Sequence, residues 1–286
     1  MPDMAQDITV EDIEYLRHGD RPLLMRLMRP VGAEPLPVVL DLHGGAWTEG
    51  DRRSCAMRDE ILARAGIASA ALDFRQGTDG YLASMADLNY AVRWLKAQAP
   101  SLALDANRMG FTGASSGGHL AMLAAMRPAD PRYTAIPLAG IDGHYDARVR
   151  AVGVVAPVIN PLSRYRRAVR AKQSPNPPAR AGRISALHDA YWRTEEAMAE
   201  GSPTLILERG EAVEMPPVLY IQGRPDAAHI YRDPEGGDDA NEPERFARLY
   251  RARGGTIDFR YVDLDRDMKQ SPLLYHPLAK FFCEHL

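Results

Sequence analysis

The chain has 286 residues, of which 45% are hydrophobic and 26% are charged, and its formal net charge is -3. This is the composition of a globular chain long enough for one large α/β domain. A pI near 6.3 argues against a nucleic-acid-binding protein, because such a surface needs a basic domain.

No apolar run approaches the roughly 18 residues of a membrane helix. The acidic first residues lack the pattern of a signal peptide, and two distant cysteines, Cys55 and Cys283, form no disulfide framework. We therefore expect a cytoplasmic protein that binds neither membrane nor nucleic acid.

Apolar runs alternate with helical patterns along the chain, after two edge strands that a turn at Gly19 and Asp20 joins. Such alternation predicts a mostly parallel sheet with helices on both faces. The alternation stops between Asn160 and Pro216, and connections this long often form a cap at the edge where such sheets bind ligands. We expect a single domain, residues 1–286, with a cap at about 160–215. Strands are expected at residues 14–17, 23–27, 37–42, 67–74, 109–111, 152–155, 218–221 and 257–262, and helices at 57–66, 85–95, 120–126, 187–198, 243–252 and 274–286.

The segment after the strand at 109–111 reads Gly-Ala-Ser-Ser-Gly and ends at Gly117. The pattern Gly-x-Ser-x-Gly between a strand and a helix is typical of a nucleophile elbow, a strained turn that exposes the serine hydroxyl. Glycines suit such a turn because a Cβ atom would clash where backbones pack closely. Ser115 is therefore the candidate nucleophile.

A second motif, His-Gly-Gly-Ala-Trp, begins at His43 directly after the strand at 37–42. Backbone N–H groups in a glycine turn can converge on one oxygen atom. The N–H groups of Gly44, Gly45 and Ser116 would then form an oxyanion hole. Each motif alone is a weak signal, whereas both in this order and on these elements favour a serine hydrolase.

The chain resembles the α/β-hydrolase superfamily, in particular carboxylesterases of the hormone-sensitive-lipase and feruloyl-esterase type. The resemblance implies an α/β-hydrolase fold with a central, mostly parallel sheet of about eight strands, helices on both faces and a helical cap. It also implies Ser, Asp and His in chain order, and hydrolysis of esters or amides through an acyl-enzyme without a cofactor. The matching stretches, which span nearly the whole chain, are HGGAWTEGDR, LDFR, MADLNYAVRWL, GASSGGH, GSP and PPVLYIQGRPD.

The resemblance assigns the nucleophile to Ser115 and the acid to Asp226, in the segment QGRPD after the strand at 218–221. The family carries its histidine after the last strand, but residues 263–270 contain none. We expect His276 to act as the base, because the final helix begins at the edge where that strand ends. His229, three residues after Asp226, is the alternative, although such close neighbours rarely reach the required geometry. A chain without a base would instead be a ligand-binding pseudo-hydrolase, like the plant gibberellin receptors.

The expected cap is rich in basic residues, and residues 163–183 contain no acid. Guanidinium groups bind carboxylate and phosphate groups through paired hydrogen bonds, so we expect a substrate with an acidic group. A solvated helix face is the alternative. The basic residues are Arg164, Arg166, Arg167, Arg170, Lys172, Arg180 and Arg183.

Four further side chains are expected to meet the substrate: His43 and Trp47 beside the oxyanion turn, and Tyr191 and Trp192 from the cap. His43 would also brace its own turn, and cap packing explains Tyr191 and Trp192 equally well. We expect no metal, because no pair of residues has ligand spacing. The sequence thus predicts a serine carboxylesterase for a small ester. An amidase or formamidase is the alternative among enzymes, and a homodimer is a further expectation from the resemblance.

Overall fold

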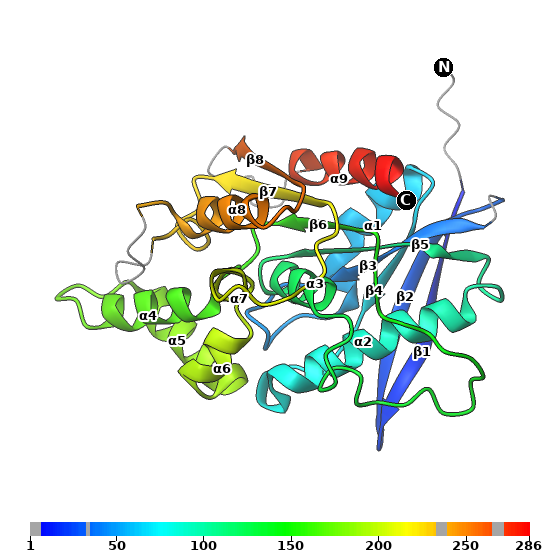
Figure 1. The fold of residues 1–286 in the computed structure, drawn as a ribbon, viewed down its shortest axis with the longest axis horizontal. Coiled ribbons are helices and arrows are strands. Elements are labelled where there is room, and N and C mark those ends of the chain that lie inside the picture. The colour runs from blue at the N-terminus through cyan, green and yellow to red at the C-terminus, as the bar shows by residue number, and fades with distance from the viewer. Residues whose placement is uncertain (1–6, 33–34, 233–238, 265–271) are drawn as a thin grey trace.

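Eight strands form one sheet in the order β1-β2-β4-β3-β5-β6-β7-β8 (Figure 1). The computed structural model describes residues 7–32, 35–232, 239–264 and 272–286. β1 and β2 form an antiparallel hairpin and β2 runs antiparallel to β4, whereas every other pair is parallel. The prediction of a mostly parallel sheet of about eight strands is confirmed. The strands are β1 (Ile8–His18), β2 (Arg21–Pro30), β3 (Leu36–Leu42), β4 (Ala68–Leu72), β5 (Leu104–Ala114), β6 (Ala151–Val155), β7 (Val218–Arg224) and β8 (Ile257–Asp263).

Helices cover both faces of the sheet, as the alternating pattern predicts (Figure 1). One face carries α1 and α9, and the other carries α2, α3 and α8. Because both faces are covered, the inner strands are mostly apolar, and every residue of β4 and β6 is buried. These helices are α1 (Ala56–Arg64), α2 (Tyr81–Gln98), α3 (Ser116–Met126), α8 (Glu242–Ala252) and α9 (Pro272–His285), and two short 3₁₀ helices, Arg52–Cys55 and Gly77–Asp79, precede α1 and α2.

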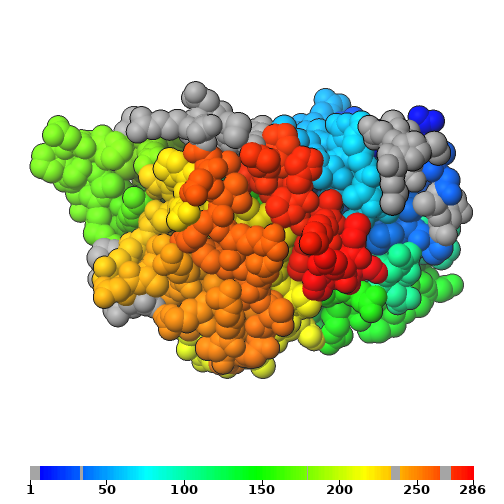
Figure 2. Space-filling model, turned by 90° about the horizontal axis from the view of Figure 1, so that it is seen from above, coloured from blue at the N-terminus to red at the C-terminus, as the bar shows by residue number. Residues whose placement is uncertain are grey.

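The chain between β6 and β7 holds four helices, α4 (Pro161–Lys172), α5 (Ala179–Trp192), α6 (Glu195–Glu200) and α7 (Pro203–Glu208). We call α4 to α6 the cap helices. They pack on one another and lie at the end of the molecule away from the N-terminal strands (Figure 2). The single helix predicted at 187–198 is wrong. Arg193, at φ 66°, ends α5, and the Thr194 side chain caps a new helix. The single domain stays a prediction.

A buried ion pair fixes the strand that leads into the His-Gly-Gly turn. Arg58 of α1 bonds Asp41 of β3 through Nε to Oδ2 at 2.9 Å and Nη2 to Oδ1 at 2.5 Å, and both side chains are buried. The next residue in α1, Asp59, accepts a hydrogen bond from the Ser69 hydroxyl. Burial, reinforced by the negative charge of Asp41, raises the pKa of Asp59 well above its usual range. The shift favours the neutral form of Asp59 beside the Arg58–Asp41 ion pair.

We expect Arg58→Met to lower the free energy of unfolding by about 3–5 kcal/mol, because it leaves Asp41 buried without its countercharge. Urea unfolding at pH 7 measures the effect. Asp59→Asn is the matched control, since an amide replaces a carboxyl group whose neutral form burial favours, and it should cost less than about 1 kcal/mol. A raised folded-state pKa means that the wild type loses stability as pH rises above the unfolded value of about 4. Asp59→Asn should remove that loss, and equal effects of the two substitutions would contradict the assignment.

Candidate active site

Ser115 occupies a strained turn between β5 and α3, with φ 55° and ψ −119°. A positive φ is costly for a residue with a side chain and persists only where the surroundings enforce it. Gly113 and Gly117 let the neighbouring backbone pack closely enough to enforce this conformation. A Cβ atom on Gly113 would lie 2.6 Å from the carbonyl carbon of Gly117, and one on Gly117 would lie 2.1 Å from the carbonyl oxygen of Leu42. The predicted elbow geometry is confirmed at Ser115.

An unbroken hydrogen-bonded chain connects Ser115 to His229 and Asp226. The Ser115 Oγ lies 2.9 Å from the His229 Nε2, and the His229 Nδ1 lies 2.6 Å from the Asp226 Oδ2. An ionised carboxylate only accepts hydrogen bonds, so Nδ1 carries the proton. The Nε2 lone pair then faces the Ser115 hydroxyl, which donates to it. This is the arrangement in which an imidazole can take a proton from a serine.

A single helical turn after β7 places Asp226 and His229 side by side. The backbone carbonyl of Asp226 accepts from the N–H of Ile230 at 2.8 Å. Side chains three residues apart in such a turn lie on the same face, so Asp226 and His229 meet. The Asp226 Oδ1 accepts from the backbone N–H groups of Ala228 at 2.9 Å and His229 at 3.2 Å. The remaining carboxylate contact comes from the Gln222 Nε2, which lies 3.3 Å from the Asp226 Oδ2.

The surroundings of Asp226 keep its carboxylate ionised. Burial by itself raises the pKa of Asp226. Hydrogen bonding and charge from His229, together with the backbone N–H groups of Ala228 and His229, outweigh burial and lower the pKa to about 2. A permanent negative charge there orients the imidazole and stabilises its protonated form.

The expectation that His276 lies beside Ser115 is wrong. His276 is exposed on α9, a helix at the surface in Figure 2. The register of α9 buries Leu274, Tyr275 and Leu278 against the sheet and turns His276 to solvent. The loop after β8, where the family carries its histidine, lies mostly outside the described residues. The signal that identifies His229 is the spacing Asp-x-x-His directly after a strand.

The His-Gly-Gly turn lies against the elbow. A Cβ atom on Gly44 would lie 3.4 Å from the Ser115 Cβ. Gly45 has φ 120°, and a Cβ atom there would lie 1.9 Å from the carbonyl oxygen of Glu49, so the turn requires glycine. In the part of the chain that the structure describes, the N–H groups of Gly44, Gly45 and Ser116 have no acceptor, and Ser116 is the first residue of α3. These donors are therefore available to an oxyanion.

His43 braces the oxyanion turn. Its ring stacks on Phe74 with 4.5 Å between centroids, and its Nδ1 donates to the carbonyl of Gly44 at 2.8 Å. Burial lowers the pKa of His43, so the ring is a neutral support. The bracing role is confirmed, whereas contact with substrate stays a prediction.

Trp47, Tyr191 and Trp192 pack on one another, each at 2% exposure or less. The Trp47 ring stacks on Tyr191 at 5.6 Å and meets Trp192 edge-on at 5.4 Å. Its Nε1 donates to the His119 Nδ1 at 3.1 Å, and His119 Nε2 donates to the Gly201 carbonyl at 2.8 Å. These rings connect α5 to the oxyanion turn, and their contact with substrate stays a prediction.

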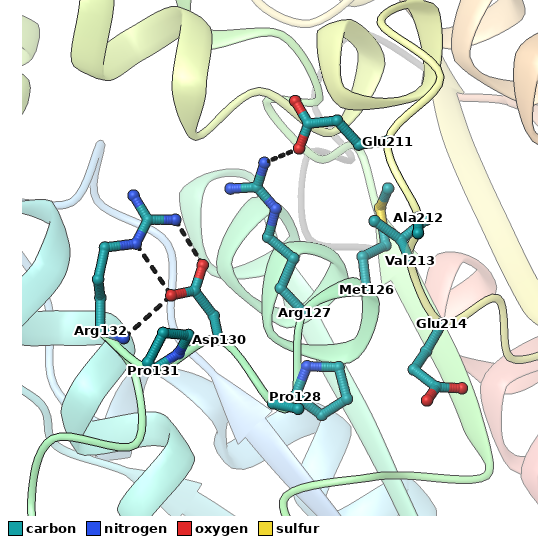
Figure 3. Close-up of a pocket in the computed structure, with 11 residues that line it drawn as sticks. Met126, Arg127, Pro128, Asp130, Pro131, Arg132, Glu211, Ala212, Val213 and Glu214 are labelled. Carbon is teal, nitrogen blue, oxygen red and sulfur yellow. Dashed lines mark hydrogen bonds and ion pairs between the residues drawn. The ribbon is translucent and has the colours of Figure 1, made fainter.

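A cavity of about 580 Å³ lies at the end of α3 remote from Ser115 (Figure 3). Since α3 has 11 residues, the two places are roughly 15 Å apart along the helix. The charged groups of this cavity are paired, Arg127 with Glu211, Arg132 with Asp130, and Glu214 with Arg148 outside the lining. The cavity therefore offers no unpaired charge beside a nucleophile.

Residues 7–32, 35–232, 239–264 and 272–286 contain no group of three or more His, Cys, Asp or Glu side chains that could hold a metal ion. Within those ranges, none of the helices has the length and apolar character needed to cross a membrane. Cys55 is a buried free thiol and Cys283 an exposed one.

Several curated relatives match part of the chain. A probable carboxylic ester hydrolase, LipM of Mycobacterium tuberculosis, is 35% identical over 99 residues, which are 34% of this chain and 23% of the relative. An ethyl acetate hydrolase of Pseudomonas putida is 32% identical over 133 residues, which are 45% of this chain and 42% of the relative. The match thus spans less than half the length of either relative.

Several solved structures are similar over nearly the whole chain. Esterase B of Lactobacillus rhamnosis has a TM-score of 0.72 at 19% identity, covering 99% of this chain and 88% of that structure. Esterase LipW of Mycobacterium marinum has a TM-score of 0.71 at 20% identity, covering 97% and 82%. At these identities the likeness establishes the fold, which confirms the expected α/β-hydrolase architecture.

The family model named BD-FAE matches residues 27–228. This range includes the oxyanion turn, the elbow with Ser115, and Asp226, and it ends one residue before His229. It covers more than half of the chain. The chain therefore belongs to the BD-FAE family and has the α/β-hydrolase fold.

Proposed function

We propose that this protein is a serine carboxylesterase that cleaves a small carboxylic ester through an acyl-enzyme intermediate. The observation that carries the proposal is the hydrogen-bonded chain Ser115–His229–Asp226, which lies beside three free backbone N–H donors. The names of the matched relatives, a carboxylic ester hydrolase and an ethyl acetate hydrolase, support the same reaction class.

Each group has a defined part in the proposed reaction. His229 Nε2 takes the hydroxyl proton as the Ser115 Oγ attacks the ester carbonyl carbon. The oxygen that gains negative charge turns to the N–H groups of Gly44, Gly45 and Ser116. Asp226 stabilises the imidazolium, which returns its proton to the departing alcohol. Water, activated by the same imidazole, then releases the acid from the acyl-enzyme.

Two alternatives are less well supported. An amidase would use the same residues, and we place ester cleavage first because the named relatives act on esters. The ligand-binding pseudo-hydrolase depended on a missing base, and the hydrogen bond from Ser115 to His229 argues against that premise. The cytoplasmic location and the homodimer stay predictions.

Replacing Ser115 by alanine should abolish turnover. We expect Ser115→Ala to lower kcat/KM for 4-nitrophenyl acetate and butyrate by at least ~10³-fold, and to abolish fluorophosphonate labelling, because it removes the hydroxyl that is hydrogen-bonded to His229. Ser116→Ala is the matched control: it keeps the backbone N–H and removes a neighbouring hydroxyl, so labelling and most activity should persist. Labelling of Ser115→Ala at the wild-type rate would refute the assignment.

Comparison of two histidine variants identifies the base. His229→Ala should lower kcat/KM by at least ~10³-fold, because Ser115 loses its proton acceptor. His276→Ala changes an exposed residue of α9 and should leave kcat/KM within about twofold. The opposite ranking of the two variants would restore His276 as the base.

Asp226→Asn should lower kcat by about 10⁴-fold while Ser115 labelling by strong reagents remains measurable, because the amide favours the wrong imidazole tautomer. With its pKa at about 2, Asp226 stays ionised throughout the neutral range. A lowered pKa stabilises the folded state above the unfolded value of about 4, and that contribution is lost as pH falls toward about 2. Urea unfolding should therefore separate wild type from Asp226→Asn at pH 7 and bring them closer at pH 3. An equal gap at both pH values would contradict the assigned charge.

A further inference from the structure

Most cap arginines have partners, which supports the solvated-face alternative for them. The Arg166 Nη2 lies 2.7 Å from the Glu195 Oε2, and the Arg183 Nη2 lies 2.6 Å from the Glu49 Oε2. Arg183 is 66% exposed. Charges of this kind, neutralised at the surface, need no ligand to explain them.

Arg164 of α4 differs from these residues. It is only 8% exposed, and its buried Nε and Nη1 atoms have no hydrogen-bond partner within the described chain. An arginine stays charged in proteins, and a buried charge without a partner is costly. Burial lowers the pKa of Arg164 but does not remove its charge. Local folding therefore does not account for this guanidinium.

Arg164 lies on the face of α4 that contacts the loop after β7, which carries Asp226 and His229. Arg167 follows Arg164 by three residues, so these two side chains share one face of α4, and Asn160 precedes α4 as its N-cap. The Asn160 carbonyl accepts from the Tyr231 hydroxyl at 2.9 Å, and the Arg167 Nη1 donates to the carbonyl of Ala227 at 2.8 Å. Both partners flank His229, so α4 holds Arg164 between two contacts with that loop.

Two of the titratable neighbours of Arg164, Asp226 and His188, do not neutralise it. The charge of Asp226 acts on Arg164, but both Asp226 oxygens already accept hydrogen bonds from His229, Gln222 and backbone N–H groups. On the other side, the His188 Nδ1 donates to the Ile184 carbonyl at 2.8 Å. Burial and the charge of Arg164 lower the pKa of His188 to about 3, so His188 is neutral.

We propose that Arg164 binds a carboxylate of the substrate, so that the preferred esters carry a negative charge on their acyl or alcohol part. This inference rests on the esterase function proposed above. A guanidinium can hold a carboxylate through two parallel hydrogen bonds, and a buried one exerts a stronger pull than one in water. Arg164 would then be a specificity-determining residue rather than a catalytic one.

Matched pairs of charged and neutral esters test the proposal. For the acyl side, we compare mono-4-nitrophenyl adipate with 4-nitrophenyl heptanoate, and for the alcohol side, 4-acetoxybenzoate with its methyl ester. We expect the wild type to favour the charged member of one pair, mainly through a lower KM. Arg164→Met should lower kcat/KM for that member by about 10- to 100-fold more than for the neutral one, and Arg164→Lys should retain part of the preference. Arg166→Met, in the same helix but paired with Glu195, should leave the preference intact.

Thermal unfolding separates recognition from a structural role. The probes are adipate for the acyl pair and 4-hydroxybenzoate for the alcohol pair. The probe that matches the favoured pair should raise the Tm of Ser115→Ala. It should not raise the Tm of Ser115→Ala/Arg164→Met. A wild type without preference in either pair, or Arg164→Met that slows both members equally, would overturn the proposal. If the wild type cleaves the charged and neutral esters equally well, the proposal for Arg164 fails but the esterase function stands. If the wild type cleaves no ester, the esterase function itself fails.

Discussion

The active site depends on one close contact between backbones, made where α3 begins under the end of β3. The α-carbon of Gly117 approaches the carbonyl of Leu42 so closely that any side chain would collide with it. This contact fixes the elbow, and with it the strained backbone of Ser115, against the segment that continues into Gly44. The nucleophile and the oxyanion donors are therefore positioned by the same contact. Catalysis of acyl transfer requires the nucleophile and the oxyanion donors at a fixed relative position. Here packed backbone, rather than mobile side chains, fixes that position.

The base has a comparably local origin. Asp226 accepts hydrogen bonds from the backbone of its own turn, and the turn carries His229 back onto the carboxylate. Acid and base thus form one unit after β7. The backbone N–H donors also help to keep Asp226 ionised, which in turn fixes the tautomer that Ser115 requires. One short turn therefore determines the position of His229, the charge of Asp226 and the tautomer of the imidazole.

The sheet and the elbow could be predicted because local patterns determine them. Apolar runs mark the buried strands, and Gly113 and Gly117 mark a turn that admits no Cβ. The choice of base could not be predicted in this way. It depends on a helical turn between Asp226 and His229 that the spacing permits but does not require. The roles of the cap arginines could not be predicted either. Arg183 pairs with a residue 134 positions away in the sequence, so only the folded structure distinguishes this paired arginine from Arg164.

The cap is attached to both halves of the site, which links selectivity to catalysis. On the oxyanion side, Trp47 packs against the aromatic residues of α5. On the side of the base, Asn160 caps α4, accepts from Tyr231 through its carbonyl, and donates from Nδ2 to Glu242 of α8 at 3.0 Å. A carboxylate held by Arg164 would consequently lie at a fixed distance from the reacting carbonyl. Interactions remote from the bond that breaks accelerate a reaction when they hold the substrate in its reactive position. A buried charge in a braced cap meets that condition better than the more exposed arginines around it.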